Sequence, residues 1–311
     1  MIDRKLFDLG ILAFSAFMLS AAQLTMAKVP CDEGARYYRL AQKSGGAQDF
    51  AKATLWLTKS VSACPSYDAY HLLGAAYKKQ RLLGESLNAY EKAVEYASEA
   101  DKAAISLARY GQVLSLNGQR YEALTMLERA IDMHSQPPAW IRSTAKELDV
   151  SLASKPVSSE SIKRSLASQE FGLLSLTKFS KTNKTGNGSK PMPAKKTKIG
   201  IPINFQYNSV MMDQLTSENV GQLGAALADE AYNGRTFTLV GHTDVRGDWA
   251  YNLDLSRQRA SAARNALLVA YPQLEGRLTI KGEGETNPKY SGDSLRETDH
   301  RLNRRLEVWV N

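Results

Sequence analysis

The stretch GHTDVRGDWAYNLDLSRQRA, residues 241–260, decides how the second half of this chain is interpreted. A strand-like run ends at Val240, and a helix rich in Ala and Leu is predicted from about residue 255 through residue 270. Asp244 therefore comes just beyond a strand end, and Arg259 lies near the start of the next helix. Ligands of α/β folds usually bind beyond strand ends. The stretch thus predicts a salt bridge, a catalytic pair or a clamp for a group that carries both charges.

Strands and helices alternate on both sides of this stretch. Strand-like runs are predicted from residue 199 and at 235–241, 277–282 and 305–310, and helical runs at 210–232 and 255–270. Asn208-Ser209 is the predicted start of the first of these helices. The order βαβαββ predicts an α/β sandwich in which a mixed sheet carries helices on one face. Residues 199–311 are expected to form one such domain.

The N-terminal half has a different pattern, a repeated pair of helices. Apolar faces recur over residues 67–97 and again over 104–134, and a weaker version precedes them from Tyr37. Small residues occupy matching places in the units, where they allow two helix backbones to approach closely: Gly74, Gly111, Ala93 and Ala130. The pattern predicts stacked helix pairs.

This pattern resembles the tetratricopeptide repeat, with small residues in the middle of the first helix and late in the second. The resemblance covers about residues 34–135 as three units. It implies an all-α repeat domain, expected at 31–153, whose concave groove suits a peptide or a helix. A generic helical bundle is the alternative. A further helix, residues 139–152, is expected to cover the open end of the last unit.

The first residues have the pattern of an export signal. Arg4 and Lys5 precede an apolar core, LGILAFSAFMLSAA, and Thr25-Met26-Ala27 offers a small-residue cleavage site. We expect residues 1–27 to be a cleaved signal peptide. The alternative is an uncleaved anchor. A contact with the membrane is expected only in that case. Either way the bulk of the chain is expected outside the cytosol, which argues against nucleic acid as a partner.

The chain has two cysteines, Cys31 and Cys64. In an oxidising compartment a disulfide is the natural interpretation. Cys31 lies at the start of the first predicted helix and Cys64 at the end of its antiparallel partner, so the two ends meet. Such a bridge would staple the terminal repeat, which lacks one neighbour.

Positive charge is concentrated between the two predicted domains. The chain has 40 basic and 32 acidic residues, a formal net charge of +8, yet residues 171–212 contain no acidic residue. Residues 154–198, rich in Lys, Gly, Ser and Pro after a possible short helix at 159–168, are expected to be a basic flexible linker. A binding site for acidic glycan or lipid is the alternative for this charge run.

Four ordered motifs extend over residues 199–311: INFQYNS, LVGHTDVRGDWAYNLDLSRQRA, IKGEGETNP and LNRRLEV. Together they resemble the OmpA-like C-terminal domain, the peptidoglycan-associating module of outer membrane and stator proteins. The resemblance implies that this domain binds the diaminopimelate side chain of peptidoglycan stem peptides. The residues on the matching positions are Asp244, Arg259, Asn252, Asn208, Thr243, Leu255 and Arg304.

The residue types fit that ligand, which ends in an ammonium and a carboxylate on one carbon. Arg259 can hold the carboxylate with two parallel N–H bonds, which a lysine cannot do as well. Asp244 can accept from the ammonium, and Asn208 and Asn252 can satisfy the remaining donors and acceptors. If Ser256 caps the helix, its first-turn N–H groups also point at the anion.

Two other interpretations of this stretch remain open. Asp244 and Arg259 could form a salt bridge that merely ties strand to helix. His242 lies beside Asp244 and Ser256, but the chain has no Gly-x-Ser-x-Gly elbow and no set of His, Cys or Glu with metal spacing. We therefore expect no catalytic residues, no metal and no cofactor.

The sequence predicts a non-catalytic adaptor of the periplasm or cell envelope of a Gram-negative-type bacterium. It would bind peptidoglycan through residues 199–311 and recruit an unidentified envelope protein through its repeat groove. The alternative is a periplasmic protein-binding scaffold in an envelope assembly or secretion system, with wall binding secondary.

Overall fold

The computed structural model describes residues 31–168, 198–201, 203 and 205–311. The expected signal peptide lies outside the described residues, as does most of the expected linker, residues 169–197. Within the described part, no helix has the length and hydropathy needed to cross a membrane.

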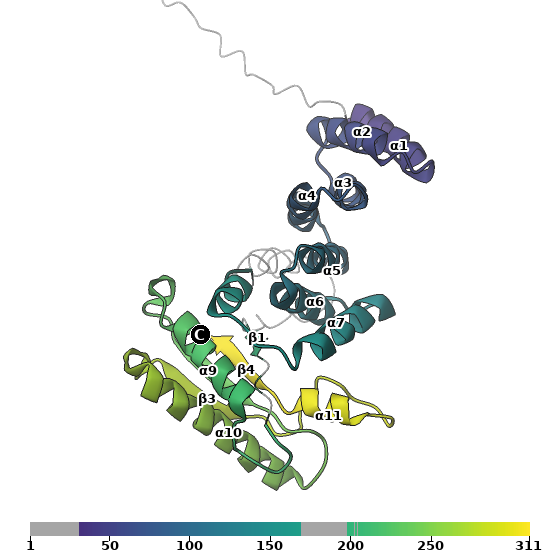
Figure 1. Ribbon diagram of the computed structural model, residues 1–311. Helices are drawn as coiled ribbons and strands as arrows, with labels where there is room; N and C mark the ends of the chain where they lie inside the picture. Colours follow the sequence, from purple (N-terminus) through teal and green to yellow (C-terminus); the bar gives the residue numbers. More distant parts are fainter. Residues whose placement is uncertain (1–30, 169–197, 202, 204) are drawn as a thin grey trace, which may run out of the picture.

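The predicted helix pairs are present in the N-terminal half. The helices are α1 (Cys31–Gly46), α2 (Phe50–Ala63), α3 (Tyr67–Lys79), α4 (Leu83–Tyr96), α5 (Ala100–Leu116), α6 (Arg120–Met133) and α7 (Ala139–Leu152). Helices α1 to α6 form three antiparallel pairs, and α7 packs against α6 as predicted. Figure 1 shows the pairs stacked in an extended array, with α1 and α2 farthest from the C-terminal domain.

The small residues of the repeats lie where two helices approach closely. A Cβ added to Gly74 would lie 2.9 Å from the ring of Tyr90, which is fully buried between α3 and α4. A Cβ on Gly111 would lie 3.0 Å from the backbone oxygen of Ala123 in α6. Glycine is therefore needed at these crossings, as the repeat pattern predicted.

The predicted disulfide is present between Cys31 and Cys64, whose Cα atoms are 5.0 Å apart. It joins the first residue of α1 to the residue that follows α2. The terminal pair is thus closed covalently at its open end.

The C-terminal domain has the predicted mixed sheet. Its elements are β1 (Lys198–Ile201), α9 (Gln214–Leu227), η1 (Glu230–Tyr232), β2 (Phe237–Gly241), α10 (Trp249–Ala270), η2 (Pro272–Leu274), β3 (Leu278–Gly282), α11 (Glu297–Asn303) and β4 (Leu306–Val310). The strand order is β1-β4-β2-β3. Strands β2 and β3 are parallel, and β4 pairs antiparallel with both β1 and β2. The fold class predicted from the sequence is therefore confirmed.

Two helices begin later or earlier than predicted, and a third helix was not predicted. Helix α10 begins at Trp249 instead of about residue 255, because the Asp248 carboxylate caps it by accepting from two backbone N–H groups. Helix α9 is capped by Asp213 and begins after it, so Asn208-Ser209 is not its start. The short helix α11 between β3 and β4 was not predicted.

One face of the sheet forms the core of this domain. Leu239 of the central strand packs there with Val220 of α9 and Ala263 of α10. Residues 159–168 are helical and add Ile162 and Leu166 to the same core. The beginning of the segment expected to be a linker, 154–168, is thus a packed part of the C-terminal domain. Its apolar side chains recur at helical spacing and pack against the sheet.

The repeat domain contacts the C-terminal domain directly. Lys289, in the loop before α11, lies 2.5 Å from Glu128 of α6 and 2.7 Å from Asp149 of α7. Lys146 of α7 lies 2.6 Å from Asp299 of α11. Burial alone would lower the pKa of Lys289, but its two carboxylate partners outweigh this and raise the pKa. The ammonium therefore stays charged between the two domains.

Candidate pocket beyond strand β2

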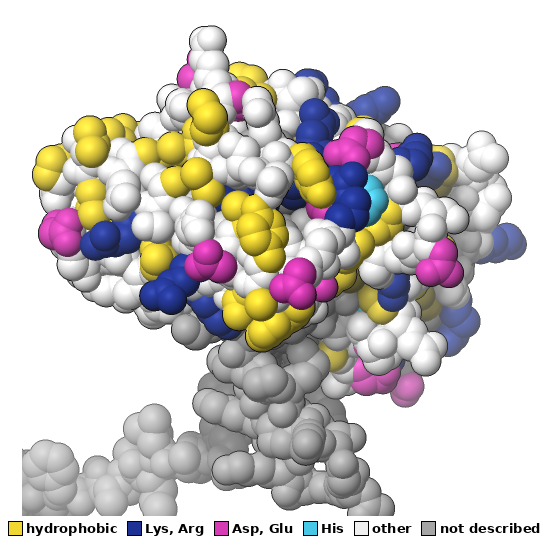
Figure 2. Space-filling model, turned by 90° about the horizontal axis from the view of Figure 1, so that it is seen from below, with side chains coloured by type: hydrophobic (Ala, Val, Ile, Leu, Met, Phe, Trp, Pro, Cys, Tyr) yellow, Lys and Arg dark blue, Asp and Glu magenta, His cyan; other side chains and the backbone are white. Residues whose placement is uncertain are grey.

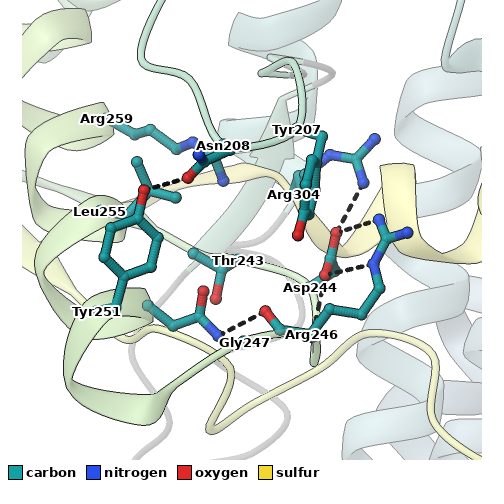
Figure 3. A pocket seen from close by; sticks show the side chains of 11 residues that line it. Tyr207, Asn208, Thr243, Asp244, Arg246, Gly247, Tyr251, Leu255, Arg259 and Arg304 are labelled. Atoms are coloured by element: carbon teal, nitrogen blue, oxygen red, sulfur yellow. Dashed lines mark hydrogen bonds and ion pairs between the residues drawn. The ribbon is translucent and has the colours of Figure 1, made fainter.

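A pocket of about 320 Å³, measured out to open solvent, lies beyond the C-terminal end of β2. It is lined by Tyr207, Asn208, Thr243, Asp244, Arg246, Gly247, Tyr251, Asn252, Leu255, Arg259 and Arg304. All seven residues predicted for the ligand site are among them. They come from the loop after β1, the loop after β2, α10 and the C-terminal end of α11, so the fold gathers residues from four places in the chain (Figure 3).

Close packing of α10 on β2 sets the geometry of the pocket. A Cβ added to Gly241 would lie 2.0 Å from the backbone oxygen of Ser256. Only glycine permits this approach, which brings the middle of α10 over the strand end. Arg259, one turn further along α10, then reaches the floor of the pocket.

Arg259 is fully buried and held by the backbone. Its Nε donates to Ser209 O (3.0 Å), its Nη2 to Gln206 O (2.9 Å) and its Nη1 to His242 O (3.4 Å). Burial and the charge of Arg304 lower its pKa to about 10, so the guanidinium remains charged at neutral pH. A guanidinium has five N–H donors. Two remain for a ligand.

Asp244 is buried on the opposite side of the pocket, with Thr243 between it and Arg259 in Figure 3. Its carboxylate accepts from Arg246 Nε (3.0 Å), Arg246 Nη2 (2.8 Å) and Arg304 Nη1 (2.7 Å). Burial raises the pKa of Asp244, but these hydrogen bonds outweigh it and lower the pKa to about 2. Among the described residues no ion pair joins Asp244 to Arg259. The simple salt bridge between them is therefore not the arrangement the chain adopts.

Thr243 has a fixed backbone and an unsatisfied side chain. Its backbone N–H donates to Gly284 O (2.9 Å), which fixes the residue beside the strand end. Its hydroxyl is buried and has no hydrogen-bond partner within the described part of the chain. Buried hydroxyls are normally satisfied, so this group is suited to a hydrogen bond with a bound molecule.

The two predicted asparagines help to shape the pocket. Asn252 is buried, and its amide donates to Arg246 O (3.0 Å) and to the Glu285 carboxylate. It therefore holds the loop after β2 against α10. Asn208 adopts a left-handed conformation (φ 55°) and accepts from the Tyr251 hydroxyl. Leu255 is buried and provides an apolar wall.

Ser256 does not cap a helix. It lies inside α10, where its hydroxyl donates to Leu253 O (2.7 Å) and accepts from Gly284 N (2.9 Å). The expectation that first-turn N–H groups at Ser256 face the ligand is wrong, because those groups belong to the helix interior. Ser256 instead ties α10 to the loop after β3.

Four side chains around the pocket were not predicted from the sequence. Arg246 binds Asp244, and Glu297 at the start of α11 binds both Arg246 and Arg304. Tyr207 and Tyr251 line the opening and are half exposed or more. The spacing of Asp244 and Arg246 within one tight loop was the available signal. Nothing in the sequence pattern links Glu297 to this site.

The residues weighed for catalysis are not arranged for it. His242 is buried and does not line the pocket, and burial lowers its pKa. Its Nε2 lies 3.6 Å from Glu307 on β4. The Ser256 hydroxyl donates to a backbone carbonyl rather than to His242. In the described residues no group of three His, Cys, Asp or Glu side chains could hold a metal ion.

The surface of the C-terminal domain is mixed in charge on the side viewed from below. Figure 2 shows hydrophobic side chains lying among basic and acidic ones, without a large area of one sign. The excess of positive charge in the sequence does not gather on this face.

Comparison with known proteins supports the assignment of this domain. The family model described as the OmpA family matches residues 204–301. Outer membrane porin F of Pseudomonas aeruginosa is 28% identical over 120 residues, which cover 39% of this chain and 33% of the porin. The chain thus spans about a third of the length of this relative.

Two solved structures are also similar to parts of the chain. The peptidoglycan-associated lipoprotein of Burkholderia pseudomallei has 24% identity and a TM-score of 0.32, covering 38% of this chain and 92% of that one. The N-terminal domain of stress-induced protein-1 from C. elegans has 21% identity and a TM-score of 0.36, covering 40% and 98%. TM-scores this low support no functional conclusion. The family match, in contrast, coincides with the sheet and the pocket, and residues 204–301 of this chain are an OmpA family domain.

Proposed function

We propose that the pocket beyond β2 binds peptidoglycan non-covalently, by holding the diaminopimelate of the stem peptide. The observation that carries this proposal is that Arg259 and Asp244 line the same pocket without binding each other. One pocket presents a buried guanidinium with two free N–H donors and, across from it, a buried carboxylate. The match of residues 204–301 to the OmpA family agrees with this ligand.

The two charges of the pocket correspond to the two charges of the ligand. The ligand carboxylate would accept from the remaining N–H groups of Arg259 and from the unsatisfied hydroxyl of Thr243. The ligand ammonium would donate to Asp244, which is ionised at any physiological pH because its pKa is about 2. Leu255 would contact the carbon between the two groups. The role is binding without catalysis.

We propose that the repeats recruit a protein of the cell envelope. Large hydrophobic side chains are exposed on α1, α2, α5 and the loop before α4, namely Leu40, Leu55, Leu116 and Leu82. Stacked helix pairs suit recognition of a peptide or a helix. The chain would then be an adaptor that holds this partner at the peptidoglycan, with the pocket and the repeats in one packed body.

The test is sedimentation of the full chain with insoluble peptidoglycan that contains diaminopimelate. The full chain is used because Ile162 and Leu166 belong to the core of the C-terminal domain, so a fragment from residue 199 would lack them. Asp244→Asn keeps the shape of the side chain and removes its charge. We expect its affinity to fall about 30-fold or more, equivalent to about 2 kcal/mol or more for losing one partner of a desolvated charge pair.

Asp254→Asn is the matched control, since Asp254 is exposed on α10 and contacts only Gln258 among its described hydrogen-bond partners. It should sediment as the wild type does. Circular dichroism and thermal unfolding check that both variants fold. If the folded Asp244→Asn variant also sediments as the wild type does, the proposed role of the pocket is wrong.

A further inference from the structure

Asp244 is already saturated by donors from its own chain. An ionised carboxylate offers about four lone-pair positions. Its Oδ1 accepts from Arg246 N (3.1 Å) and Arg246 Nε (3.0 Å), and its Oδ2 accepts from Arg246 Nη2 (2.8 Å) and Arg304 Nη1 (2.7 Å). A ligand ammonium therefore cannot bind Asp244 until one of these donors leaves.

The two arginines are not equally free to leave. The side chain of Arg304 is 7% exposed, and its Nε is held by Phe205 O (3.2 Å) in the interior. The side chain of Arg246 is 38% exposed and sits in the loop after β2. Arg246 is thus the donor that a ligand can displace, while Arg304 stays as a fixed partner of Asp244.

Arg246 also has a second partner to retain when it leaves Asp244. Its Nη1 donates to Glu297 Oε2 (3.0 Å), and its guanidinium lies 4.8 Å from the centre of the Tyr207 ring. Glu297 is 65% exposed, so it can follow the arginine outward. In Figure 3 the Arg246 guanidinium lies directly against Asp244 at the edge of the pocket.

We propose that Arg246 is an internal competitor of the ligand: its guanidinium occupies the ammonium position on Asp244 and must swing toward Glu297 before a ligand with an ammonium and a carboxylate can bind. This inference rests on the proposed function of the pocket. In this inference Arg246 controls the affinity for the ligand, whereas Asp244 and Arg259 contact the ligand directly. The domain would hold the wall reversibly because each binding event must open this contact.

The expected size of the effect follows from the strength of the contact. A charge-assisted hydrogen bond is stronger than a neutral one, and it contributes less at a partly exposed site than at a buried one. If the contact is closed roughly 90% of the time, the apparent dissociation constant is raised about tenfold. Removing the guanidinium should therefore tighten ligand binding by about that factor.

The experiment is calorimetric or NMR titration of the full chain with soluble meso-diaminopimelate. Arg246→Gln removes the competing cation, and Arg246→Lys keeps the charge without the paired N–H bonds. Arg257→Gln is the control for loss of one positive charge, because Arg257 is exposed on α10 and does not line the pocket. We expect binding about tenfold tighter for Arg246→Gln, an intermediate value for Arg246→Lys and no change for Arg257→Gln.

The outcomes separate this inference from the proposed function. If the wild type binds and both Arg246 variants, shown to be folded, bind equally or more weakly, Arg246 is a structural or direct contact and the inference is overturned. If no protein in the set binds meso-diaminopimelate, the proposed function fails and the inference fails with it. Binding by Arg246→Gln together with weak or undetectable binding by the wild type supports both.

Discussion

Lys289, whose side chain is only 19% exposed between the two domains, offers the sharpest test of how the chain is held together. Lys289→Met keeps the length of the side chain and removes the ammonium from between Glu128 and Asp149, to which it is bound at 2.5 and 2.7 Å. Removing one partner of a buried ion pair costs about 3–5 kcal/mol, because the remaining charge is left uncompensated. The Tyr290 hydroxyl still donates to Asp149 (2.8 Å), which favours the lower end of that range.

The assay is thermal unfolding of the full chain at neutral pH. For a unit of 150–250 residues, 1 kcal/mol shifts the midpoint by about 2–4 °C, so Lys289→Met should lower it by about 6–20 °C. Lys281→Met is the matched control, since Lys281 pairs with Glu283 at 2.5 Å but is 51% exposed. An exposed pair contributes less than about 1 kcal/mol. If the two variants unfold at the same temperature, the charged contact between the domains does not stabilise the chain and our account of the interface is wrong.

Three other perturbations have defined outcomes. Replacing Cys31 and Cys64 by Ala removes a bridge with a sequence separation of 33, which should destabilise the α1–α2 pair by about 3–4 kcal/mol. Hydrogen exchange should then become faster in α1 and α2 but not in α9 or α10. Gly241→Ala forces a Cβ to 2.0 Å from a backbone oxygen of α10 and should lower the free energy of unfolding, measured by urea denaturation, by about 3 kcal/mol or more. Gly221→Ala is the control, because it has open space around it and should be neutral or slightly stabilising. Asp244 has a folded pKa of about 2 against its ordinary value of 3.8, so its contribution of about 2 kcal/mol is present above pH 4 and is lost as the pH falls toward 2. The stability of Asp244→Asn should lack this part of the pH dependence, and an identical pH profile would contradict the assignment.

The sequence was informative where local patterns control the structure. Paired helices with glycine at the crossings, such as Gly74, could be predicted because helical spacing and small residues determine which faces meet. The strand β2 and the pocket residues Asp244 and Arg259 could be placed because a conspicuous motif joins a strand to a helix. The disulfide followed from two cysteines in an oxidising compartment together with the antiparallel geometry of the first helix pair.

The sequence was less informative where a residue's role depends on a distant partner. Arg304 reaches Asp244 across 60 positions, and Glu297 reaches the same network from a short helix that was not predicted. The start of α10 was predicted about two turns too late, because the cap at Asp248 cannot be identified without the structure around it. The helix at 159–168 lies in a basic, Ser-rich segment, and its role became clear only from the sheet that Ile162 covers.

The central claim is that the pocket recognises the zwitterionic end of diaminopimelate. The most direct test is sedimentation of the full wild-type chain with two insoluble peptidoglycans, one with diaminopimelate and one with lysine at the same position of the stem peptide. Lysine retains the ammonium but lacks the carboxylate that Arg259 would bind. The account predicts that the chain sediments with the first material and stays in solution with the second. Equal sedimentation with both would show that Arg259 does not bind a ligand carboxylate in this pocket, and would contradict the account.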